Sequence, residues 1–448
     1  MNITVIGGGS FTWAFGFLRQ FVRSKRLHGA QIALMDINRE ALELVAAAGR
    51  TYNVAHGSPV RIEATMDFDR ALDGADYVLV TISTGGLDSM QYDLTIPEKY
   101  RIWHTVGDTT GPGSWSRAAR NIPVFRDLAR RMTERCPEAW LFNLSNPLTV
   151  LTRTPDKEFG VKAIGMCPGV EGQARMLSNL AGAREDACVE YTCVGVDHAS
   201  WFTRLHADGM DVLQRLRDTG YWWREGQPEL VALADDPMAG PSGNVVNFAL
   251  WRQYGYMPTV PDRHTVENHP SFIVNEDGTL GYGLHRTTVA ERRAAARRRK
   301  DELEAYVKTG NEADFGKMGH GDDPVLQVIE SLSGHRSFLW GSNYRNMGQM
   351  RGAPEDAVVE TRCLFDSAGV HPLCSPLPEV LKPLLMPMIH RQEAVLDVVL
   401  RGRFDEFVAL VASDPLCCRL SPGRCREMMK ELLLATREWI QNPKLLKF

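Results

Sequence analysis

Features of secreted and membrane proteins are missing from this sequence. The nine cysteines are scattered, apart from the neighbours Cys417 and Cys418, so they make a poor disulfide framework and favour a reducing compartment. No run of about 18 apolar residues occurs, which argues against a membrane-spanning helix. The first residues lack the basic region, apolar stretch and cleavage site of a signal peptide. We therefore expect a soluble protein of the cytoplasm.

A large excess of charge is also missing. The formal net charge of the 448 residues is −4, and 44% of them are hydrophobic, as in a soluble globular protein. This balance predicts no general attraction to nucleic acid or to an anionic membrane. An anionic substrate would have to be held by local arginine, lysine or metal. A chain of this length is too long for a single hydrophobic core of ordinary size. It usually folds as two domains or as one domain with a large extension.

Strand and helix signals alternate over residues 1–165. Short apolar or β-branched runs predict strands at residues 3–6, 31–35, 77–82, 139–144 and 163–166. Residues 12–24 are typical of a helix, and Asn38 is placed to cap the next one. Strands separated by helices predict an α/β domain with a Rossmann-like, doubly wound parallel sheet.

The pattern after residue 165 is irregular and predicts a C-terminal domain of mixed α+β structure, residues 166–448. Residues 190–196 are typical of a strand, and residues 221–285, rich in Pro, Gly and Trp, indicate long loops. Residues 286–308 predict a helix whose basic run, 297–300, is interpreted as a solvent-facing surface. Residues 380–441 predict two or more terminal helices.

A glycine triplet separates the first predicted strand from the first helix. Gly7, Gly8 and Gly9 would let backbone N–H groups approach a pyrophosphate at the N-terminus of that helix. The pattern departs from G-x-G-x-x-G because Thr12 holds the last position. Asp36, at the end of the next strand, is placed to accept hydrogen bonds from ribose hydroxyls, and its charge would repel a 2′-phosphate. These features predict NAD rather than NADP.

Another strand end extends the predicted nucleotide site. Residues 81–86 terminate a parallel strand, and ligands bind at the carboxyl ends of such strands, so we expect this segment beside the nicotinamide. The candidate NAD-binding residues are Gly7, Gly8, Gly9, Ser10, Phe11, Asp36, Thr81, Ser83 and Asn146.

A set of short motifs runs in order along nearly the whole chain. The motifs occupy residues 6–10, 34–36, 106–113, 143–147, 165–167, 195–198, 261–264, 346–348 and 358–360. This ordered set resembles glycoside hydrolase family 4. Within that family, the Gly107–Gly113 segment and the Asp262-Arg263-His264 segment are most similar to the subgroup of α-glucuronidases and α-galacturonidases.

The resemblance implies a glycosidase that works by transient oxidation. NAD+ takes hydride from sugar C3, a base removes the C2 proton, and the group at C1 is eliminated. Water then adds, and NADH returns the hydride. The family is an exception to the mechanism in which two carboxylates cleave the glycosidic bond. Spacing alone does not make Cys167 and His198 a metal site, but both match the family's metal-ligand positions. The implied ion is Mn2+, although thiolate and imidazole would also accept another divalent first-row ion.

The sequence departs from the family directly after Cys167. Some relatives use the residue there as the acid that protonates the leaving group, but here it is Pro168, which cannot transfer a proton. Glu171 is a candidate replacement. The alternatives are another proton donor, or leaving groups good enough to need none.

The C2 base has three candidates. Asp262 matches a family site carboxylate and would act as the base or orient it, while Tyr256 and Tyr254 are alternatives because some relatives use tyrosine. Asn146 is placed to hydrogen-bond the C3 or C2 hydroxyl. The residues expected to contact the sugar are Asp108, Thr109, Arg117, Asn146, Arg263 and His264, and Arg263 could hold a substrate carboxylate through two hydrogen bonds.

Two other functions fit parts of this sequence. A simple NAD-dependent sugar or hydroxyacid dehydrogenase would share the N-terminal domain, and a non-catalytic NAD or sugar sensor is compatible with Pro168. A dehydrogenase accumulates NADH in step with product, whereas a redox glycosidase does not. We expect the enzyme to be a homodimer or homotetramer that acts on a small carbohydrate.

Overall fold

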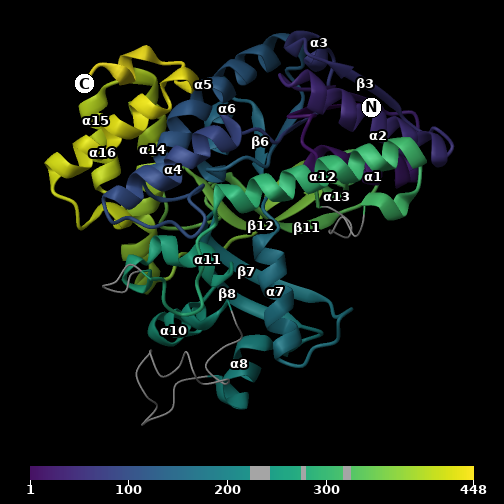
Figure 1. The fold of residues 1–448 in the computed structure, drawn as a ribbon. Helices are drawn as coiled ribbons and strands as arrows, with labels where there is room; N and C mark the ends of the chain where they lie inside the picture. Colours follow the sequence, from purple (N-terminus) through teal and green to yellow (C-terminus); the bar gives the residue numbers. More distant parts are fainter. Residues whose placement is uncertain (222–242, 274–278, 316–323) are drawn as a thin grey trace.

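A large mixed sheet forms the centre of the molecule (Figure 1). The structure is a computed structural model that describes residues 1–221, 243–273, 279–315 and 324–448. Within these residues the sheet has nine strands in the order β13-β12-β11-β6-β5-β4-β1-β2-β3. Their bounds are β1 Asn2–Ile6, β2 Gln31–Met35, β3 Arg61–Thr65, β4 Tyr77–Val80, β5 Trp140–Asn143, β6 Lys162–Gly165, β11 Phe338–Arg345, β12 Val358–Asp366 and β13 Gly369–Pro372.

The first six strands are parallel, in the order 3-2-1-4-5-6, so the predicted doubly wound sheet is confirmed. Alternate residues of β4 enter different cores: Val78 and Val80 pack on one side, Tyr77 and Leu79 on the other. Such strands are buried on both faces, which explains their continuous apolar runs.

Helices cover both faces of this sheet. One core includes residues of α1 (Trp13–Arg23), α2 (Arg39–Ala55), α12 (Val289–Thr309) and α13 (Pro324–Leu332). The other includes residues of α3 (Phe68–Leu72), α4 (Gly86–Lys99), α5 (Gly111–Arg135), α6 (Leu148–Phe159), α14 (Lys382–Arg401), α15 (Phe404–Ala412) and α16 (Pro422–Ala435). Asn38 caps α2 as predicted, since its side chain accepts a hydrogen bond from the Ala41 N–H.

The C-terminal half contributes to the same sheet. Strands β11, β12 and β13 are antiparallel and join it beside β6. The predicted domain boundary after residue 165 falls at the end of β6 but does not divide the sheet, and it stays a prediction. No helix among the described residues has the length and apolar character needed to cross a lipid bilayer.

A second, smaller sheet lies below the first in the view of Figure 1. Its strands are β7 (Val189–Val196), β8 (Ala199–Ala207), β9 (Met210–Asp211) and β10 (Met257–Pro258), and α7 (Gly169–Leu180), α8 (Val212–Leu216) and α10 (Val245–Tyr254) pack on it. The prediction of loops over residues 221–285 was wrong at α10, whose Phe248 and Trp251 are core residues. Residues 222–242 and 274–278 of that range lie outside the described residues.

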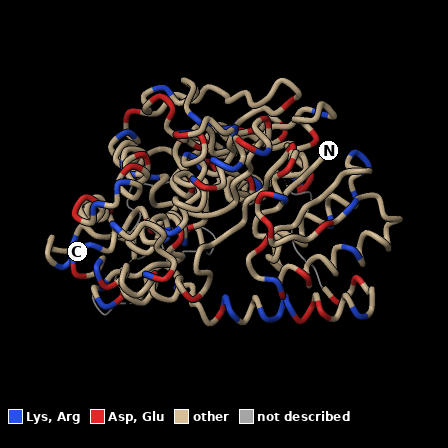
Figure 2. The backbone as a smooth tube through the Cα atoms, turned by 90° about the horizontal axis from the view of Figure 1, so that it is seen from above, with Lys and Arg blue, Asp and Glu red and all other residues tan. Residues whose placement is uncertain are grey.

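The helix predicted at residues 286–308 is α12, which begins with a capping box formed by Thr288 and Glu291. Figure 2 shows basic and acidic residues interleaved along it. In its basic run, Arg299 pairs with Glu302, and Lys300 with Glu40 of α2. The run is therefore a solvent-facing surface supported by ion pairs.

Candidate functional site

The predicted site residues follow strands that end at one edge of the sheet. Gly7 follows β1, Asp36 follows β2, Thr81 follows β4, Asn146 comes three residues after β5, and Cys167 comes two residues after β6. Parallel strands present their carboxyl ends on the same side, which is where ligands of such sheets bind. The fold thus gathers candidates from the first 167 residues along a single edge.

The glycine loop after β1 makes a close approach to two neighbouring strands. The N–H groups of Gly7 and Gly8 donate to the Met35 carbonyl at 3.0 and 2.8 Å. Gly7 has a φ of +93°, and a Cβ on it would lie 2.4 Å from the Thr81 carbonyl oxygen; a Cβ on Gly8 would lie 2.8 Å from Leu34 Cβ. Side chains are therefore excluded here, as a loop that receives a pyrophosphate requires.

Asp36 stands directly beside this loop. Its Oδ2 accepts from the Gly9 N–H and its Oδ1 from the Asn38 N–H, both at 2.9 Å. Ser10 continues the loop into α1, since its N–H donates to the Gly7 carbonyl and its Oγ accepts from the Trp13 N–H. Phe11, the next residue, is half-buried. The loop and the carboxylate of Asp36 are thus held together after β1 and β2, as the sequence predicts.

The next two strand ends supply polar groups to the same edge. Thr81 donates its N–H to the Ile6 carbonyl, and Ser83 accepts through its carbonyl from the Gly86 N–H. Asn146 precedes Pro147 through a cis peptide bond, and its carbonyl accepts from Arg117 Nε at 3.0 Å. The Thr81, Ser83 and Asn146 residues are all half-buried.

Three side chains at this edge form a group that could hold a metal ion. Cys167 Sγ lies 3.8 Å from His198 Nε2, and Asp197 Oδ2 lies 3.8 Å from the same nitrogen. Potential ligand atoms of the three residues all lie within 4.8 Å of one another. Asp197 and His198 form the two-residue turn between β7 and β8, in which His198 adopts a φ of +60°. A positive φ is uncommon for a residue other than glycine, but it is accommodated here by the tight turn between two antiparallel strands.

Asp197 lies within the motif at residues 195–198, but it is not among the predicted site residues. It is only 1% exposed. Within the described residues neither of its carboxylate oxygens accepts a hydrogen bond from nitrogen or oxygen, and the groups that face it include the Cys167 thiol and, 3.8 Å from Oδ2, His198 Nε2. Burial raises the pKa of Asp197 and, well above its usual value, that of the Cys167 thiol. The feature of the sequence that could have identified Asp197 as a site residue is its position next to His198, a candidate metal ligand.

The ring of His198 is oriented by a hydrogen-bonded chain. Thr109 Oγ1 lies 2.9 Å from His198 Nδ1 and 3.1 Å from Asp108 Oδ1. Because a carboxylate only accepts, the Thr109 hydroxyl donates to Asp108 and accepts from the His198 Nδ1–H. The lone pair of Nε2 then faces Cys167. Such an outer partner fixes the tautomer of a metal-binding histidine.

Cationic groups from two helices surround Asp108. Arg117 of α5 and Arg292 of α12 approach it, with Arg292 Nη2 3.9 Å from Asp108 Oδ2. Burial acts to raise the pKa of Asp108, but the charges of Arg117, His198 and Arg292 outweigh it and lower that pKa. Arg292 was missed by the sequence analysis because it lies in a helix that is rich in exposed arginine.

The Asp262-Arg263-His264 segment opens helix α11 (Asp262–Thr265). The His264 ring centroid lies 4.1 Å from that of His198, and burial holds the pKa of His264 well below its usual range. Arg263 donates to the Thr287 hydroxyl. Asp262 is fully buried and accepts from the N–H groups of Val246 and Asn247 at 3.0 and 2.8 Å.

Of these three residues, His264 is therefore the one in ring contact with the metal group. Burial raises the pKa of Asp262 to about 6 despite the hydrogen bonds from the start of α10. The alternative bases are both half-buried: Tyr254 ends α10 with its ring 5.6 Å from that of Trp201, and Tyr256 directly precedes β10.

The two glutamates near this region occupy different environments. Glu171, in the first turn of α7, accepts a hydrogen bond from the Tyr191 hydroxyl, and burial raises its pKa. Glu360 of β12 is buried, and its two oxygens accept from Ser200 Oγ and Asn343 Nδ2. Burial and the charge of Asp197 raise the pKa of Glu360 to about 7.

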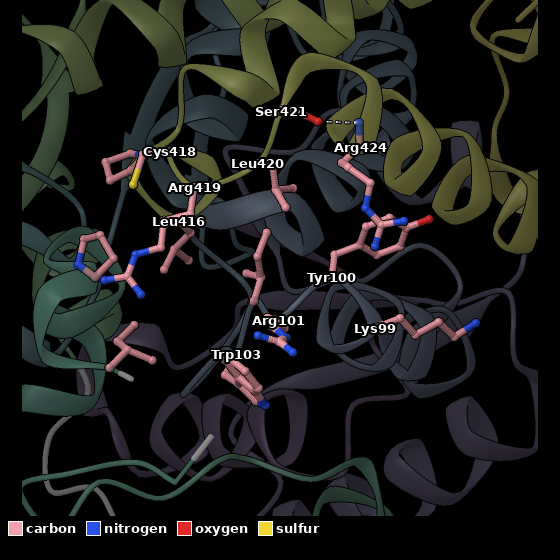
Figure 3. A pocket seen from close by; sticks show the side chains of 14 residues that line it. Lys99, Tyr100, Arg101, Trp103, Leu416, Cys418, Arg419, Leu420, Ser421 and Arg424 are labelled. Atoms are coloured by element: carbon pink, nitrogen blue, oxygen red, sulfur yellow. Dashed lines mark hydrogen bonds between the residues drawn. The ribbon is translucent and has the colours of Figure 1, made fainter. Parts of the chain in front are cut away.

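A separate cavity of about 820 Å³ lies between the end of α4 and the start of α16 (Figure 3). Its lining includes the cationic residues Lys99, Arg101, Arg419 and Arg424 together with the ring of Trp103. Lys99 and Tyr100 both contact Glu431 of α16, so the cavity wall is tied together across the two helices. No residue of the metal group lines this cavity.

A Rossmann-type sheet with a possible metal-binding group at the carboxyl ends of its strands is typical of enzymes that bind a nucleotide cofactor and a metal ion. The model of the Family 4 glycosyl hydrolase matches residues 2–183, and that of the Family 4 glycosyl hydrolase C-terminal domain matches residues 193–417. The chain therefore belongs to glycosyl hydrolase family 4. The predicted family and enzyme class are confirmed.

Relatives match over nearly their full length. An alpha-galacturonidase of Thermoanaerobacterium saccharolyticum is 30% identical over 99% of this chain and 97% of its own. An alpha-galacturonidase of Bacillus subtilis is 30% identical over 93% of each chain. The structure of Bacillus subtilis lplD is 28% identical with a TM-score of 0.84, covering 97% of this chain and 99% of that one. A 6-phospho-alpha-glucosidase from gut microorganisms, solved with NAD and Mn2+, has the same fold (TM-score 0.79, 18% identity, 98% of each chain).

Proposed function

We propose that this protein cleaves the glycosidic bond of an α-linked uronide, with NAD and Mn2+ as cofactors. The observation that carries the proposal is the position of the metal-capable group Cys167–Asp197–His198 at the sheet edge that also bears the glycine loop. The two alpha-galacturonidases at 30% identity support the substrate class. The relative solved with NAD and Mn2+ supports the cofactors.

The residues at this edge fit both cofactors. The loop at Gly7 and Gly8 has no room for a Cβ, and Asp36 lies beside it to take the ribose hydroxyls. Cys167 and His198 offer a soft thiolate and an imidazole, a donor set that suits a divalent first-row ion. When bound, NAD and the ion supply the reversible oxidation of sugar C3 and the positive charge that makes the C2 proton acidic.

The chain's own residues then orient the sugar and move its protons. Asn146, at the end of β5, is placed to hydrogen-bond the C3 or C2 hydroxyl. Asp262 is a candidate for the C2 base or for the group that orients it, and because both of its oxygens accept hydrogen bonds from the start of α10, Tyr256 and Tyr254 remain alternatives. Glu171 is the candidate leaving-group acid, since burial raises its pKa and Pro168 has no proton to give.

The cationic side chains near Asp108 support a uronide as the substrate. Arg292 is half-buried and its Nη2 makes only a 3.9 Å contact with Asp108 Oδ2, so its guanidinium could turn toward a substrate carboxylate. Arg117 is held by the Asn146 carbonyl and Arg263 by Thr287, and both would add positive charge behind it. A carboxylate at C6 would be attracted there, whereas a neutral hydroxymethyl group would not.

The test is a screen of p-nitrophenyl α- and β-glycosides and uronides with NAD+, Mn2+ and a reductant. We expect release of p-nitrophenol from an α-uronide only when both cofactors are present, with no net NADH, and a product that carries deuterium at C2 when made in D2O. Product without C2 deuterium would overturn the oxidative mechanism. NADH formed in step with product would identify a simple dehydrogenase instead.

The substrate class is tested with a matched substrate pair. An α-galacturonide and the corresponding α-galactoside differ only at C6, so the ratio of their kcat/KM values measures recognition of the carboxylate. We expect Arg292→Ala to lower that ratio and Arg292→Lys to retain part of it, because lysine keeps the charge.

We further propose a homodimer or homotetramer, which light scattering of the purified chain would measure.

A further inference from the structure

We propose that Asp197 is a third protein ligand of the metal ion, so that the site has a Cys–Asp–His donor set. The proposal rests on the proposed function, because it assumes that Cys167 and His198 hold a divalent ion. Asp197 is adjacent to His198 in the turn between β7 and β8, and its Oδ2 lies 3.8 Å from His198 Nε2. The three side chains thus already surround one point.

In the described part of the chain, the carboxylate of Asp197 lacks the hydrogen bonds from nitrogen or oxygen that usually satisfy a buried charge. Asp197 is 1% exposed, and among the described residues no nitrogen or oxygen donor reaches either of its oxygens. Glu360, equally buried, has both oxygens satisfied by Ser200 and Asn343. Buried carboxylates are normally hydrogen-bonded, paired or bound to metal. Among the described residues, the groups that contact the Asp197 carboxylate are the Cys167 thiol and, at 3.8 Å, His198 Nε2, and both are themselves candidate ligands, so a cation shared by the three side chains fits this position.

The backbone at Asp197 is fixed independently of its side chain. Its N–H group donates to Thr149 Oγ1 and Asn343 Oδ1, both at 3.2 Å. Asn343 also lies opposite Gly165 in the β11–β6 pair, two residues before Cys167. The framework that positions Asp197 therefore also contacts β6, the strand that ends two residues before Cys167. Ligands held by rigid elements in this way are preorganised for an ion.

Two anionic donors would balance the charge of a divalent ion. A thiolate from Cys167, a carboxylate from Asp197 and a neutral imidazole from His198 give a site that is neutral when filled. Such a site binds its ion before NAD or sugar arrives, and with three protein ligands it leaves coordination positions open for substrate. A site of Cys167 and His198 alone would depend more strongly on the sugar for its affinity.

The experiment measures Mn2+ binding to the full chain without NAD or sugar, from the loss of the free-ion electron paramagnetic resonance signal. We expect Asp197→Asn to weaken binding at least about 100-fold, the upper end of what loss of an outer partner costs a metal site. Asp208→Asn is the matched control, because Asp208 is an aspartate in the turn at the other end of β8. It should bind Mn2+ as the unmodified chain does.

Thermal unfolding separates a ligand from a structural aspartate. Without metal, Asp197→Asn should unfold at the same or a higher temperature, because a buried charge without partners has been removed, and Mn2+ should raise that temperature less than in the unmodified chain. A lower metal-free unfolding temperature with unchanged Mn2+ affinity would show a structural role and overturn the proposal.

Cys167→Ser distinguishes the two levels of the hypothesis. If this variant loses Mn2+ affinity while Asp197→Asn keeps it, the assignment of Asp197 fails and the proposed function stands. If the unmodified chain binds no Mn2+, and no Co2+ in its place, the proposed metal-dependent function fails as well.

Discussion

Replacement of Thr109 by valine tests whether the orientation of His198 matters. The substitution keeps the shape of the side chain but removes the hydroxyl that links His198 Nδ1 to Asp108 Oδ1 at 2.9 and 3.1 Å. Both partners are buried, so neither can recruit bulk water easily. The Nδ1–H of His198 would lose its acceptor, and the preference for a lone pair on Nε2 would be lost with it.

The expected size of the effect follows from the position of Thr109 behind a candidate metal ligand. Loss of such an outer partner typically lowers metal affinity or activity about 10- to 100-fold. The free energy of unfolding should fall by about 1–3 kcal/mol, the usual result of leaving a buried polar group without its partner. The two effects are separable, because Mn2+ affinity is measured on folded protein.

The assay compares Thr109→Val with Thr109→Ser in Mn2+ binding and in nitrogen NMR of the histidine rings. Serine restores the hydroxyl and should recover most of the affinity, and the tautomer of His198 should change only in the valine variant. If valine leaves both the Mn2+ affinity and the tautomer unchanged, the hydrogen-bonded chain through Thr109 does not orient His198 and the reasoning is refuted.

Three further changes test other parts of the site. Asp36→Ala should weaken NAD binding and relax discrimination against NADP, which calorimetry with both nucleotides measures; equal preference before and after would contradict the ribose contact. The raised pKa of Glu360, about 7, means that the folded state holds a proton that the unfolded state has released above about pH 4.5. The stability of metal-free protein should therefore fall as the pH rises from 5 to 7, and Glu360→Gln should flatten that slope in denaturant titrations. Glu171→Gln should slow alkyl glycosides more than aryl ones if Glu171 protonates the leaving group, and an equal loss on both would exclude that role.

Five of the six parallel strands could be predicted because their apolar runs are a local signal, whereas the partly exposed edge strand β3, Arg61–Thr65, has no such run and was missed. Strands buried on both faces must be apolar throughout, as Tyr77–Val80 is, and each is followed by a polar or glycine-rich turn at the ligand-binding edge. Strand β12 gives no such signal. Its buried residues Cys363 and Phe365 alternate with half-buried ones, and its partner β11 pairs with β6 from far along the chain. Nothing in residues 338–372 alone indicates that they extend the first sheet.

The site shows the same division between local and distant information. The glycine loop and Asp36 lie within one strand–helix–strand unit, so their proximity follows from sequence. Asp197 and Arg292 were missed because their importance depends on residues that are distant in the sequence. Asp197, in the β7–β8 turn, lies close to Cys167, and Arg292 of α12 lies close to Asp108. An aspartate in a turn and an arginine in a charged helix are ordinary residues until the fold supplies those partners.

The surroundings of Asp197 and Asp108, the two carboxylates near His198, shift their pKa values in opposite directions. Burial raises the pKa of Asp197, and the charge of Asp108 adds to this effect, while that of His198 opposes it. For Asp108 burial acts in the same direction, but Arg117, His198 and Arg292 outweigh it and lower the pKa. Pairs of titratable groups separated in this way divide the work of an active site between them. Asp108 is charged whether or not an ion is present, so it can orient His198 through Thr109 at all times. For Asp197, in contrast, the charge of His198 does not outweigh burial, so a bound cation would stabilise its carboxylate further, as expected of a ligand rather than of an orienting group.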